Sequence, residues 1–291
     1  QQLIGDEDVN AIYIATPPSS HATFAIMAMK AGKPVYIEKP MAASYEDCAR
    51  INRISQETGI PCFVAYYRRY LPYFQKVKEL VENGTIGNVI NVQIRFAQPP
   101  RDLDYNRDNL PWRVQADIAG GGYFYDLAPH QIDLLQDMFG CILEASGYKS
   151  NRGGLYPAED TLSACFQFDN GLVGSGSWCF VAHDSAKEDR IEIIGDKGMI
   201  CFSVFTRHAA AFTAGNVHVL QIFACRKESS HVGSLFPSHV PEVTHTAYTR
   251  IVDVAADGSS IRYLTKIECF FPVERFKDNC SPVLFCEVTH F

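Results

Sequence analysis

The sequence lacks several features that would each assign it to a class of proteins. In its 291 residues no apolar run approaches the ~20 residues that a membrane-spanning helix needs. It has no run of lysines and arginines and a formal net charge of −7, so nucleic acid is not an expected partner. Its ten cysteines form no Cys-x-x-Cys pair. We therefore expect mostly reduced cysteines in a cytoplasmic protein, with neither a membrane nor a metal ion as partner.

The first 66 residues alternate between short apolar runs and helical patterns. The runs at 11–15, 34–37 and 62–66 are typical of buried strands. A helix is predicted from Ser19 or Ser20 to Lys30, and a second over residues 44–58 with a capping-box start. This order of elements predicts a parallel, right-handed βαβαβ unit.

The pattern changes after about residue 66. Helices are predicted over 72–82 and 129–139, and a strand with one wet face over 89–96. Two tight turns, at 169–171 and 195–198, predict the strand pairs 160–168 with 172–181 and 191–194 with 199–205. We expect an α+β domain over residues 67–205, with a mostly antiparallel sheet and helices on one side. Beyond it the periodicities fade, so residues 206–291 are expected to be an irregular, mobile or poorly packed extension.

Two segments at the ends of the predicted parallel strands carry candidate functional residues. Ala15-Thr16-Pro17 follows the first strand and Glu38-Lys39-Pro40 follows the second. Because open parallel sheets bind ligands at the carboxyl ends of their strands, Lys39 is well placed to donate to a substrate oxygen. The alternative is a solvated Lys39, with Glu38 capping the next turn.

A glycine-rich segment in the second domain carries a carboxylate and an imidazole. Asp126 and His130 follow Gly120-Gly121-Gly122 and are four residues apart, so helical geometry would bring them to one face. A carboxylate beside an imidazole orients it and supports its protonated form, as a general acid/base requires. Pro129 fits the first turn of the predicted helix. The alternative is that Asp126 only caps this helix, with His130 packed beneath it.

Together these motifs resemble the Gfo/Idh/MocA oxidoreductases over roughly residues 5–205. The matching motifs are Ala-Thr-Pro, Glu-Lys-Pro and Gly-Gly-x-x-x-Asp-x-x-x-His, and Trp112-Arg113 matches a subset of the family. The resemblance implies a partial Rossmann-type parallel sheet over residues 1–66, the C-terminal part of a dinucleotide-binding domain. It also implies hydride transfer between NAD or NADP and a secondary alcohol or ketone of a sugar-, inositol- or polyol-like substrate.

The resemblance also implies the roles of individual residues. His130 would be the acid/base, Asp126 its orienting partner and Lys39 an electrostatic and proton-relay aid, with a bond to Pro40 that is commonly cis. The expected cofactor-binding residues are Ala15, Thr16, Pro17, His21, Glu38, Lys39, Pro40, Trp112 and Arg113. The expected substrate-binding residues are Tyr66, Arg68, Asp126 and His130. A homo-oligomer through the sheet of the second domain is expected.

For several of these residues a structural role is the alternative. Arg68 would then be a surface arginine, Tyr66 and Trp112 would pack in the core, and His21 would lie at the surface or cap a helix.

The sequence departs from the family pattern at both ends. The Gly-x-Gly-x-x-Gly turn that holds a pyrophosphate is absent, and the run at 11–15 matches the family's fourth strand. The resemblance therefore implies that about 60 or more residues are missing, at ~30 per βαβ unit. After residue 205 the sequence is aperiodic, as a shifted reading frame or divergence would make it. A second hypothesis thus remains open: a non-catalytic fragment or remnant, acting at most as a binding or partner subunit.

Overall fold

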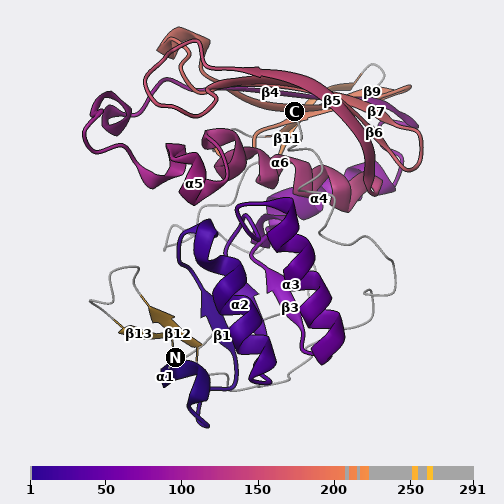
Figure 1. The fold of residues 1–291 in the computed structure, drawn as a ribbon. Coiled ribbons are helices and arrows are strands. Elements are labelled where there is room, and N and C mark those ends of the chain that lie inside the picture. The colour runs from indigo at the N-terminus through magenta and orange to yellow at the C-terminus, as the bar shows by residue number, and fades with distance from the viewer. Residues whose placement is uncertain (1, 207–209, 215–216, 223–250, 255–260, 265–291) are drawn as a thin grey trace, which may run out of the picture.

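A computed structural model describes residues 2–206, 210–214, 217–222, 251–254 and 261–264. Figure 1 shows three layers in this part of the chain. A large sheet lies at one end, helices α4, α5 and α6 form the middle layer, and the N-terminal α/β unit lies at the other end. The helix layer is therefore where the two units meet.

The N-terminal unit is a three-stranded parallel sheet in the order β1-β2-β3 with two covering helices. This is the parallel βαβαβ unit that the sequence predicts. Its elements are α1 (Gln2–Gly5), β1 (Ile12–Ile14), η1 (Pro18–Ser20), α2 (His21–Lys30), β2 (Val35–Ile37), α3 (Tyr45–Thr58) and β3 (Cys62–Val64).

The ends of these helices follow from local hydrogen bonds. Ser44 caps α3 by accepting from the backbone N–H of Asp47 at 3.2 Å, and Gly59 ends the helix at φ +68°. Ser20 precedes α2 without capping it: its side chain accepts no backbone N–H of this helix, and its hydroxyl lies 2.9 Å from the carbonyl oxygen of Pro17. The sequence thus predicted the α3 cap correctly and the α2 cap incorrectly.

The second unit is an eight-stranded sheet in the order β11-β10-β9-β8-β4-β7-β6-β5. Its neighbouring strands are antiparallel except for β4 and β7. Its strands are β4 (Val89–Ala97), β5 (Ile142–Ser150), β6 (Thr161–Phe168), β7 (Val173–Cys179), β8 (Glu188–Gly195), β9 (Gly198–Phe202), β10 (Ala210–Ala214) and β11 (Val217–Ile222). The mostly antiparallel sheet and both hairpins are confirmed.

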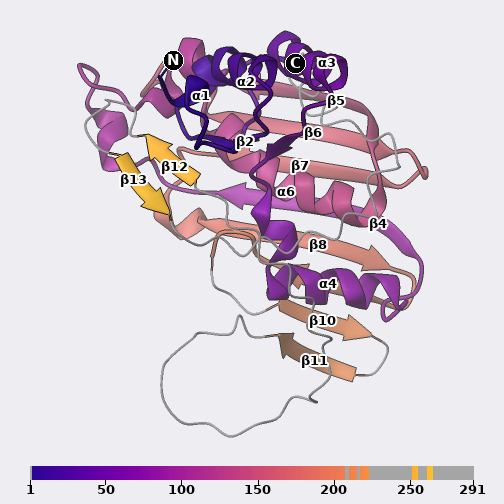
Figure 2. The same cartoon turned by 90° about the horizontal axis from the view of Figure 1, so that it is seen from below.

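Figure 2 shows α4 and α6 lying across one face of this sheet. The helical segments of the unit are η2 (Tyr67–Tyr70), α4 (Pro72–Glu82), η3 (Asp102–Tyr105), η4 (Trp112–Val114), α5 (Ala116–Ala119), α6 (Tyr123–Phe139) and η5 (Asp184–Ala186). Residues 251–254 and 261–264 pair separately as β12 (Ile251–Val254) and β13 (Ile261–Leu264). No helix in the described part of the chain is both long and apolar enough to cross a membrane.

Two elements differ from the expectation. Helix α6 begins at Tyr123 and continues through Pro129, so Asp126 lies in its first turn and Pro129 inside it. Strand β5 was not predicted, because it is an edge strand that is mostly exposed and so lacks a clear alternation of apolar residues.

Each unit has its own core. In the N-terminal unit Ile14, Ile37 and Ile51 are buried between the sheet and its helices. In the second unit Trp178 and Phe180 belong to a larger cluster between the sheet and α6. The large sheet and α6 therefore form a rigid support for side chains that α6 directs toward the N-terminal unit.

Beyond residue 205, β10 and β11 continue the large sheet where the sequence predicted no elements. Most of the predicted irregular extension, residues 206–291, lies outside the described residues, and so does most of the stretch expected to be mobile.

Candidate active site

The candidate site lies where the strand ends of the N-terminal unit meet α6. The segment Glu38-Lys39-Pro40 follows β2, and the backbone N–H of Glu38 bonds the carbonyl oxygen of Ile14 at 2.8 Å. The peptide bond between Lys39 and Pro40 is cis, as the family resemblance implied. This backbone directs the Lys39 side chain across the boundary between the units.

Lys39 forms an ion pair with Asp126 of α6. Its Nζ donates to Asp126 Oδ1 at 2.6 Å and to the Asp126 carbonyl oxygen at 2.7 Å. Both side chains are mostly buried, at 14% and 17% exposure. Arg113 Nε lies 3.2 Å from the other carboxylate oxygen of Asp126. Burial opposes ionisation of Asp126, but Lys39 and then Arg113 outweigh it, so its pKa lies below the ordinary value.

His130 lies one turn further along α6 and is 5% exposed. The rings of Tyr67 and Phe205 meet its imidazole edge-on, at centroid distances of 6.2 Å and 5.9 Å. Its Nδ1 is buried without a hydrogen-bond partner among the described residues. Burial, and then the charges of Lys39 and Arg68, lower the pKa of His130 to about 3.

Asp126 makes no hydrogen bond to His130 within the described residues, although the sequence analysis expected it to orient the imidazole. The Asp126 carboxylate instead forms ion pairs with Lys39 and Arg113. The contacts that hold the imidazole are therefore aromatic and come from η2 and from the segment after β9.

His21 joins the two loops that were predicted to contact a cofactor. Its Nε2 lies 2.6 Å from the carbonyl oxygen of Thr16, and its Nδ1 lies 3.0 Å from that of Pro40. The side chain is 1% exposed, so its surface alternative is wrong. Burial lowers its pKa, although the two carbonyl groups act in the opposite direction. Its contacts fix the distance between the loops.

The remaining residues predicted to bind cofactor lie in the same region. Glu38 accepts a hydrogen bond from the hydroxyl of Tyr13, and Thr16 Oγ1 accepts from Ser20 Oγ at 2.6 Å. The guanidinium of Arg113 lies 4.4 Å above the Trp112 ring, which orients Arg113 toward Asp126. Ala15 is exposed and Pro17 is half-buried, both at the carboxyl end of β1.

The residues predicted to bind substrate follow β3. Tyr66 lies two residues after the end of β3, where its backbone N–H donates to the carbonyl oxygen of Val64 at 2.7 Å and turns the chain. Arg68 lies in η2, with its guanidinium 5.6 Å from the Tyr67 centroid and 5.0 Å from the Phe205 centroid. Its Nη1 donates to the carbonyl oxygen of Val204 at 2.8 Å.

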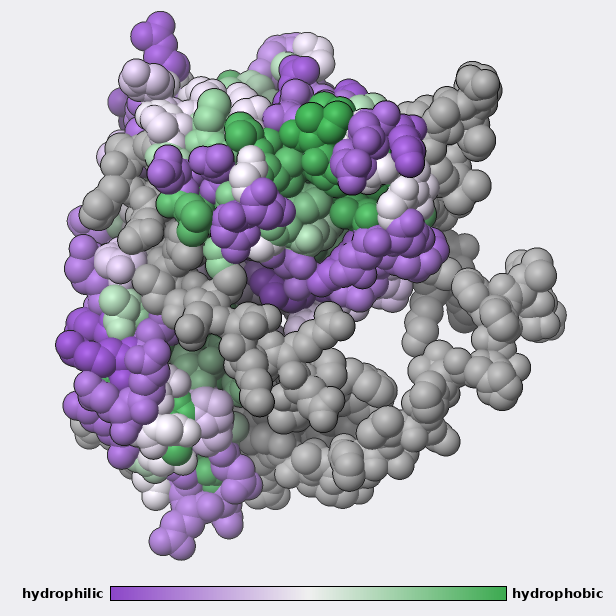
Figure 3. All heavy atoms as spheres, turned by 90° about the vertical axis from the view of Figure 1, so that its right-hand side faces the viewer, coloured by the Kyte–Doolittle hydropathy of each residue, from purple (hydrophilic) through white to green (hydrophobic). Residues whose placement is uncertain are grey.

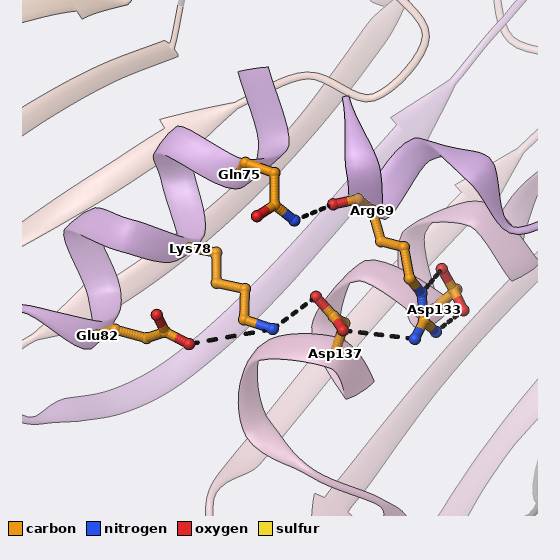
Figure 4. A network of polar contacts seen from close by, with 6 residues as sticks. All are labelled: Arg69, Gln75, Lys78, Glu82, Asp133 and Asp137. Carbon is orange, nitrogen blue, oxygen red and sulfur yellow. Dashed lines mark hydrogen bonds and ion pairs between the residues drawn. The ribbon is translucent and has the colours of Figure 1, made fainter. Parts of the chain in front are cut away.

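A network that the sequence analysis missed joins η2 to α6 (Figure 4). Arg69 donates to both carboxylate oxygens of Asp133 and lies 3.4 Å from Asp137, which Lys78 of α4 also bonds at 2.9 Å. Burial raises the pKa of Asp133 to about 6, although Arg69 acts in the opposite direction. The sequence contained one signal for this network. Asp133 follows His130 by three residues on a predicted helix, so both lie on the same face.

The segment after β9 was also missed. Asp189 accepts from the backbone N–H groups of Val204, Phe205 and Thr206, at 2.6 Å for Phe205 and 2.7 Å for Thr206. These bonds fold the segment back against α6, and so they place the Phe205 ring beside His130. Residues 203–205 were predicted as the end of the strand 199–205, because an apolar run gives no sign that a distant carboxylate bonds its backbone.

Comparison with known proteins places this geometry in a family. Residues 1–66 match the family model described as an oxidoreductase family with an NAD-binding Rossmann fold. Residues 74–201 match the model of the Gfo/Idh/MocA C-terminal domain. The chain belongs to the Gfo/Idh/MocA oxidoreductase family, as its motifs predicted.

Individual relatives agree with this assignment. The chain is 38% identical over 208 residues to oxidoreductase P35 of Formosa agariphila, covering 71% of this chain and 63% of that protein. It is 29% identical over 211 residues to myo-inositol 2-dehydrogenase of Thermotoga maritima, covering 68% and 58%. A levoglucosan dehydrogenase in complex with NADH and levoglucosan superposes with a TM-score of 0.68 at 27% identity, covering 76% and 63%. The chain thus spans less than two thirds of each of these relatives.

The residues present fit the reacting end of a nicotinamide dinucleotide. The carboxyl ends of β1 and β2, where open parallel sheets bind ligands, lie beside Lys39, and His130 keeps a buried nitrogen without a partner. Thr16, Glu38 and Trp112 are among the residues that would hold it. The described residues contain no cluster of three or more His, Cys, Asp or Glu side chains that could bind a metal ion.

Proposed function

We propose that this protein is an NAD(P)-dependent oxidoreductase that acts on a secondary alcohol or ketone of a sugar-, inositol- or polyol-like substrate. The observation that carries the proposal is the contact of Lys39 with Asp126 beside His130, which brings an ammonium, a carboxylate and an imidazole together from two units. The names of the relatives, an inositol dehydrogenase and a levoglucosan dehydrogenase, support this substrate class.

Lys39 would stabilise negative charge on the substrate oxygen. An ammonium has three N–H donors, and Asp126 accepts from two of them. The third can donate to the reacting oxygen, where it favours the alkoxide that forms when the hydroxyl proton is removed, before the hydride leaves the carbon that bears this oxygen. Asp126 fixes the ammonium in position, and Arg113 holds the other side of Asp126.

His130 would exchange the proton of the substrate hydroxyl. With its pKa lowered, the imidazole is neutral at pH 7 and can accept that proton in the oxidation direction and return it in the reduction direction. When bound, the nicotinamide supplies the hydride acceptor or donor. Tyr67 and Phe205 limit the access of water to the imidazole, because both rings pack against it.

The second candidate function is a non-catalytic remnant that binds a sugar-like compound or a partner without turnover. Residues 1–291 contain no Gly-x-Gly-x-x-Gly turn at the start of a βα unit, so a nucleotide titration decides whether this stretch binds a dinucleotide. The intact set of Lys39, Asp126 and His130 favours catalysis.

We also propose a homo-oligomer through the face of the large sheet opposite α4 and α6. Tyr148 and Val173 are exposed on this face, where they pair with the outward-facing Ser163 and Asn91. Figure 3 shows a further apolar patch on the side of the sheet-containing unit that lies at the right of Figure 1, which is a different side from this face. A cytoplasmic location stays a prediction.

The test is a fluorescence titration of the protein with NADH and NADPH, followed by turnover assays on a panel of sugars and inositols. Micromolar binding of one nucleotide and reduction of NAD or NADP by one of the alcohols would support the oxidoreductase. A folded protein that binds neither nucleotide would support the remnant.

A further inference from the structure

Arg68 carries a charge beside the candidate site that no acid balances. Its Nη1 donates to the Val204 carbonyl oxygen, its Nε is buried without a partner, and no carboxylate pairs with it among the described residues. The neighbouring Arg69 pairs with two aspartates, and Arg113 pairs with Asp126. Arg68 thus differs from both of these arginines, which pair with carboxylates of α6.

The environment of Arg68 fixes the plane of its guanidinium. The Tyr67 and Phe205 rings both contact it, with their centroids 5.6 Å and 5.0 Å from its central carbon. The Phe205 ring is itself held in place, because Asp189 binds the backbone N–H of Phe205 at 2.6 Å. A planar, pre-oriented guanidinium matches a carboxylate better than a neutral hydroxyl group.

The charge of Arg68 reaches the reacting centre. Arg68 and Lys39 both lower the pKa of His130, which places both cations close to the imidazole. Asp126 balances the charge of Lys39, whereas no carboxylate in the described part of the chain pairs with Arg68. Burying part of a guanidinium without an acceptor costs free energy, and a bound anion would recover that free energy.

On these grounds, and given the proposed function, we propose that the substrate carries a carboxylate that Arg68 binds. The substrate class is then a sugar acid or a carboxylated cyclitol, with its reacting hydroxyl at Lys39 and His130. Arg68 is held by the segment from Val204 to Thr206. This segment lies after residue 201, where the match to the family's C-terminal model ends.

A purely structural role for Arg68 would be to anchor Val204. That role needs one hydrogen-bond donor, and a neutral side chain would supply it without the cost of an unbalanced charge. The two roles predict different ligand selectivity, because only a carboxylate receptor distinguishes an acid from its neutral counterpart.

The test is calorimetric titration of the protein, with and without NADH, with matched pairs of an acid and a neutral sugar. The pairs are D-glucuronate with D-glucose and D-galacturonate with D-galactose. In each pair that binds, the acid is expected to bind about 10- to 100-fold more tightly, the difference that a charge-assisted hydrogen-bond pair supplies. Arg68→Met should remove this difference between acid and neutral sugar, and Arg68→Lys should keep part of it.

The control is Arg95→Met, because Arg95 is 66% exposed and pairs with Glu188 on the far side of the sheet. This variant should keep the full preference for the acid. If Arg68→Met does not fold, the preference of the wild type and the partial preference of Arg68→Lys still test the proposal.

The outcomes separate this proposal from the proposed function. Acid binding that depends on Arg68, without turnover, would support the carboxylate receptor and contradict the oxidoreductase. Turnover of neutral sugars without any preference for the acid would contradict the receptor and leave the oxidoreductase standing. The receptor is also overturned if no sugar binds at millimolar concentration, or if glucose 6-phosphate binds more tightly than either acid.

Discussion

The Lys39 ammonium donates to both the side chain and the main chain of Asp126, which lies 87 residues later in the sequence. The first residue follows a strand of the N-terminal unit, and the second lies in the first turn of α6 in the other unit. This contact therefore ties the two units at the point where the candidate chemistry occurs. A disturbance of either unit would reach the ammonium through Asp126.

Replacement of Lys39 or His130 should impair turnover far more than folding. Lys39→Ala removes the donor that stabilises charge on the substrate oxygen, and His130→Ala removes the group that exchanges the hydroxyl proton. We expect each variant to lower kcat at least ~100-fold, which is the lower range for loss of such groups. Steady-state kinetics with the best substrate of the panel measures the effect.

Two checks accompany that experiment. Circular dichroism should show unchanged secondary structure in both variants. Arg50→Ala serves as a matched control, because Arg50 is exposed and pairs only with Asp47 on α3. Near-normal turnover in Lys39→Ala or His130→Ala would exclude the corresponding role.

The His130 imidazole should make stability depend on pH. Its folded pKa of about 3 lies below the ordinary value of 6.5, so the unfolded chain binds this proton more readily. The neutral ring thus contributes stability that is fully present above pH 6.5 and is lost as the pH falls toward 3. Across that window its contribution should fall by up to about 1.4 kcal/mol per pH unit.

The difference in unfolding free energy between wild type and His130→Gln isolates this contribution. Urea unfolding at several pH values from 7 to 4 measures it, and Asp133 cancels in the comparison because both proteins contain it. A difference that does not change with pH would show that the imidazole titrates normally.

The sequence predicted the candidate site better than it predicted the surroundings of the site. Lys39, Asp126 and His130 belong to short motifs that can be recognised in a single sequence. The carboxyl ends of parallel strands also lie at the same edge of a sheet, so the residues that follow them are expected to lie close together. The Tyr67 and Phe205 contacts depend on how η2 and the segment after β9 fold onto α6. Such long-range contacts have no local signal.

For the fold as well, the features with a local sequence signal were predicted and those without one were missed. The parallel unit and both hairpins were predicted because their apolar runs and turn residues are local. Pro129 misled the prediction of α6, since proline usually marks a first turn, whereas here the helix begins six residues earlier at Tyr123 and passes through it. The first turn of α6, which precedes Pro129, was not recognised as helical from the sequence because aromatic residues occupy it.

His21 should be required for the geometry of the two loops. His21→Phe keeps an aromatic ring of similar size but leaves the carbonyl oxygens of Thr16 and Pro40 without this partner. We expect a loss of about 1–3 kcal/mol of unfolding free energy, because the neutral imidazole donates to one of the two carbonyl oxygens and its removal leaves that buried acceptor without its donor. The Kd for NADH should rise as well, because the loops lose their fixed spacing.

Thermal and urea unfolding measure the first effect and nucleotide fluorescence the second. Ser20→Ala is the neighbouring control, since Ser20 bonds Thr16 and Pro17 within the first loop only. If His21→Phe is as stable as Ser20→Ala and binds NADH normally, His21 does not hold the loops together.

Loss of Asp133 should destabilise the protein strongly, because it would leave the Arg69 guanidinium without its main partner. The Asp133 side chain is only 4% exposed, and removal of one member of a buried ion pair costs about 3–5 kcal/mol. Asp133→Asn should therefore shift the urea midpoint far more than Asp47→Asn, whose exposed pair with Arg50 is worth about 1 kcal/mol or less. The double variant Arg69→Met with Asp133→Leu removes both charges and should recover most of the loss. If the double variant is no more stable than Asp133→Asn, the cost arises from packing around α6 and not from an unpaired guanidinium.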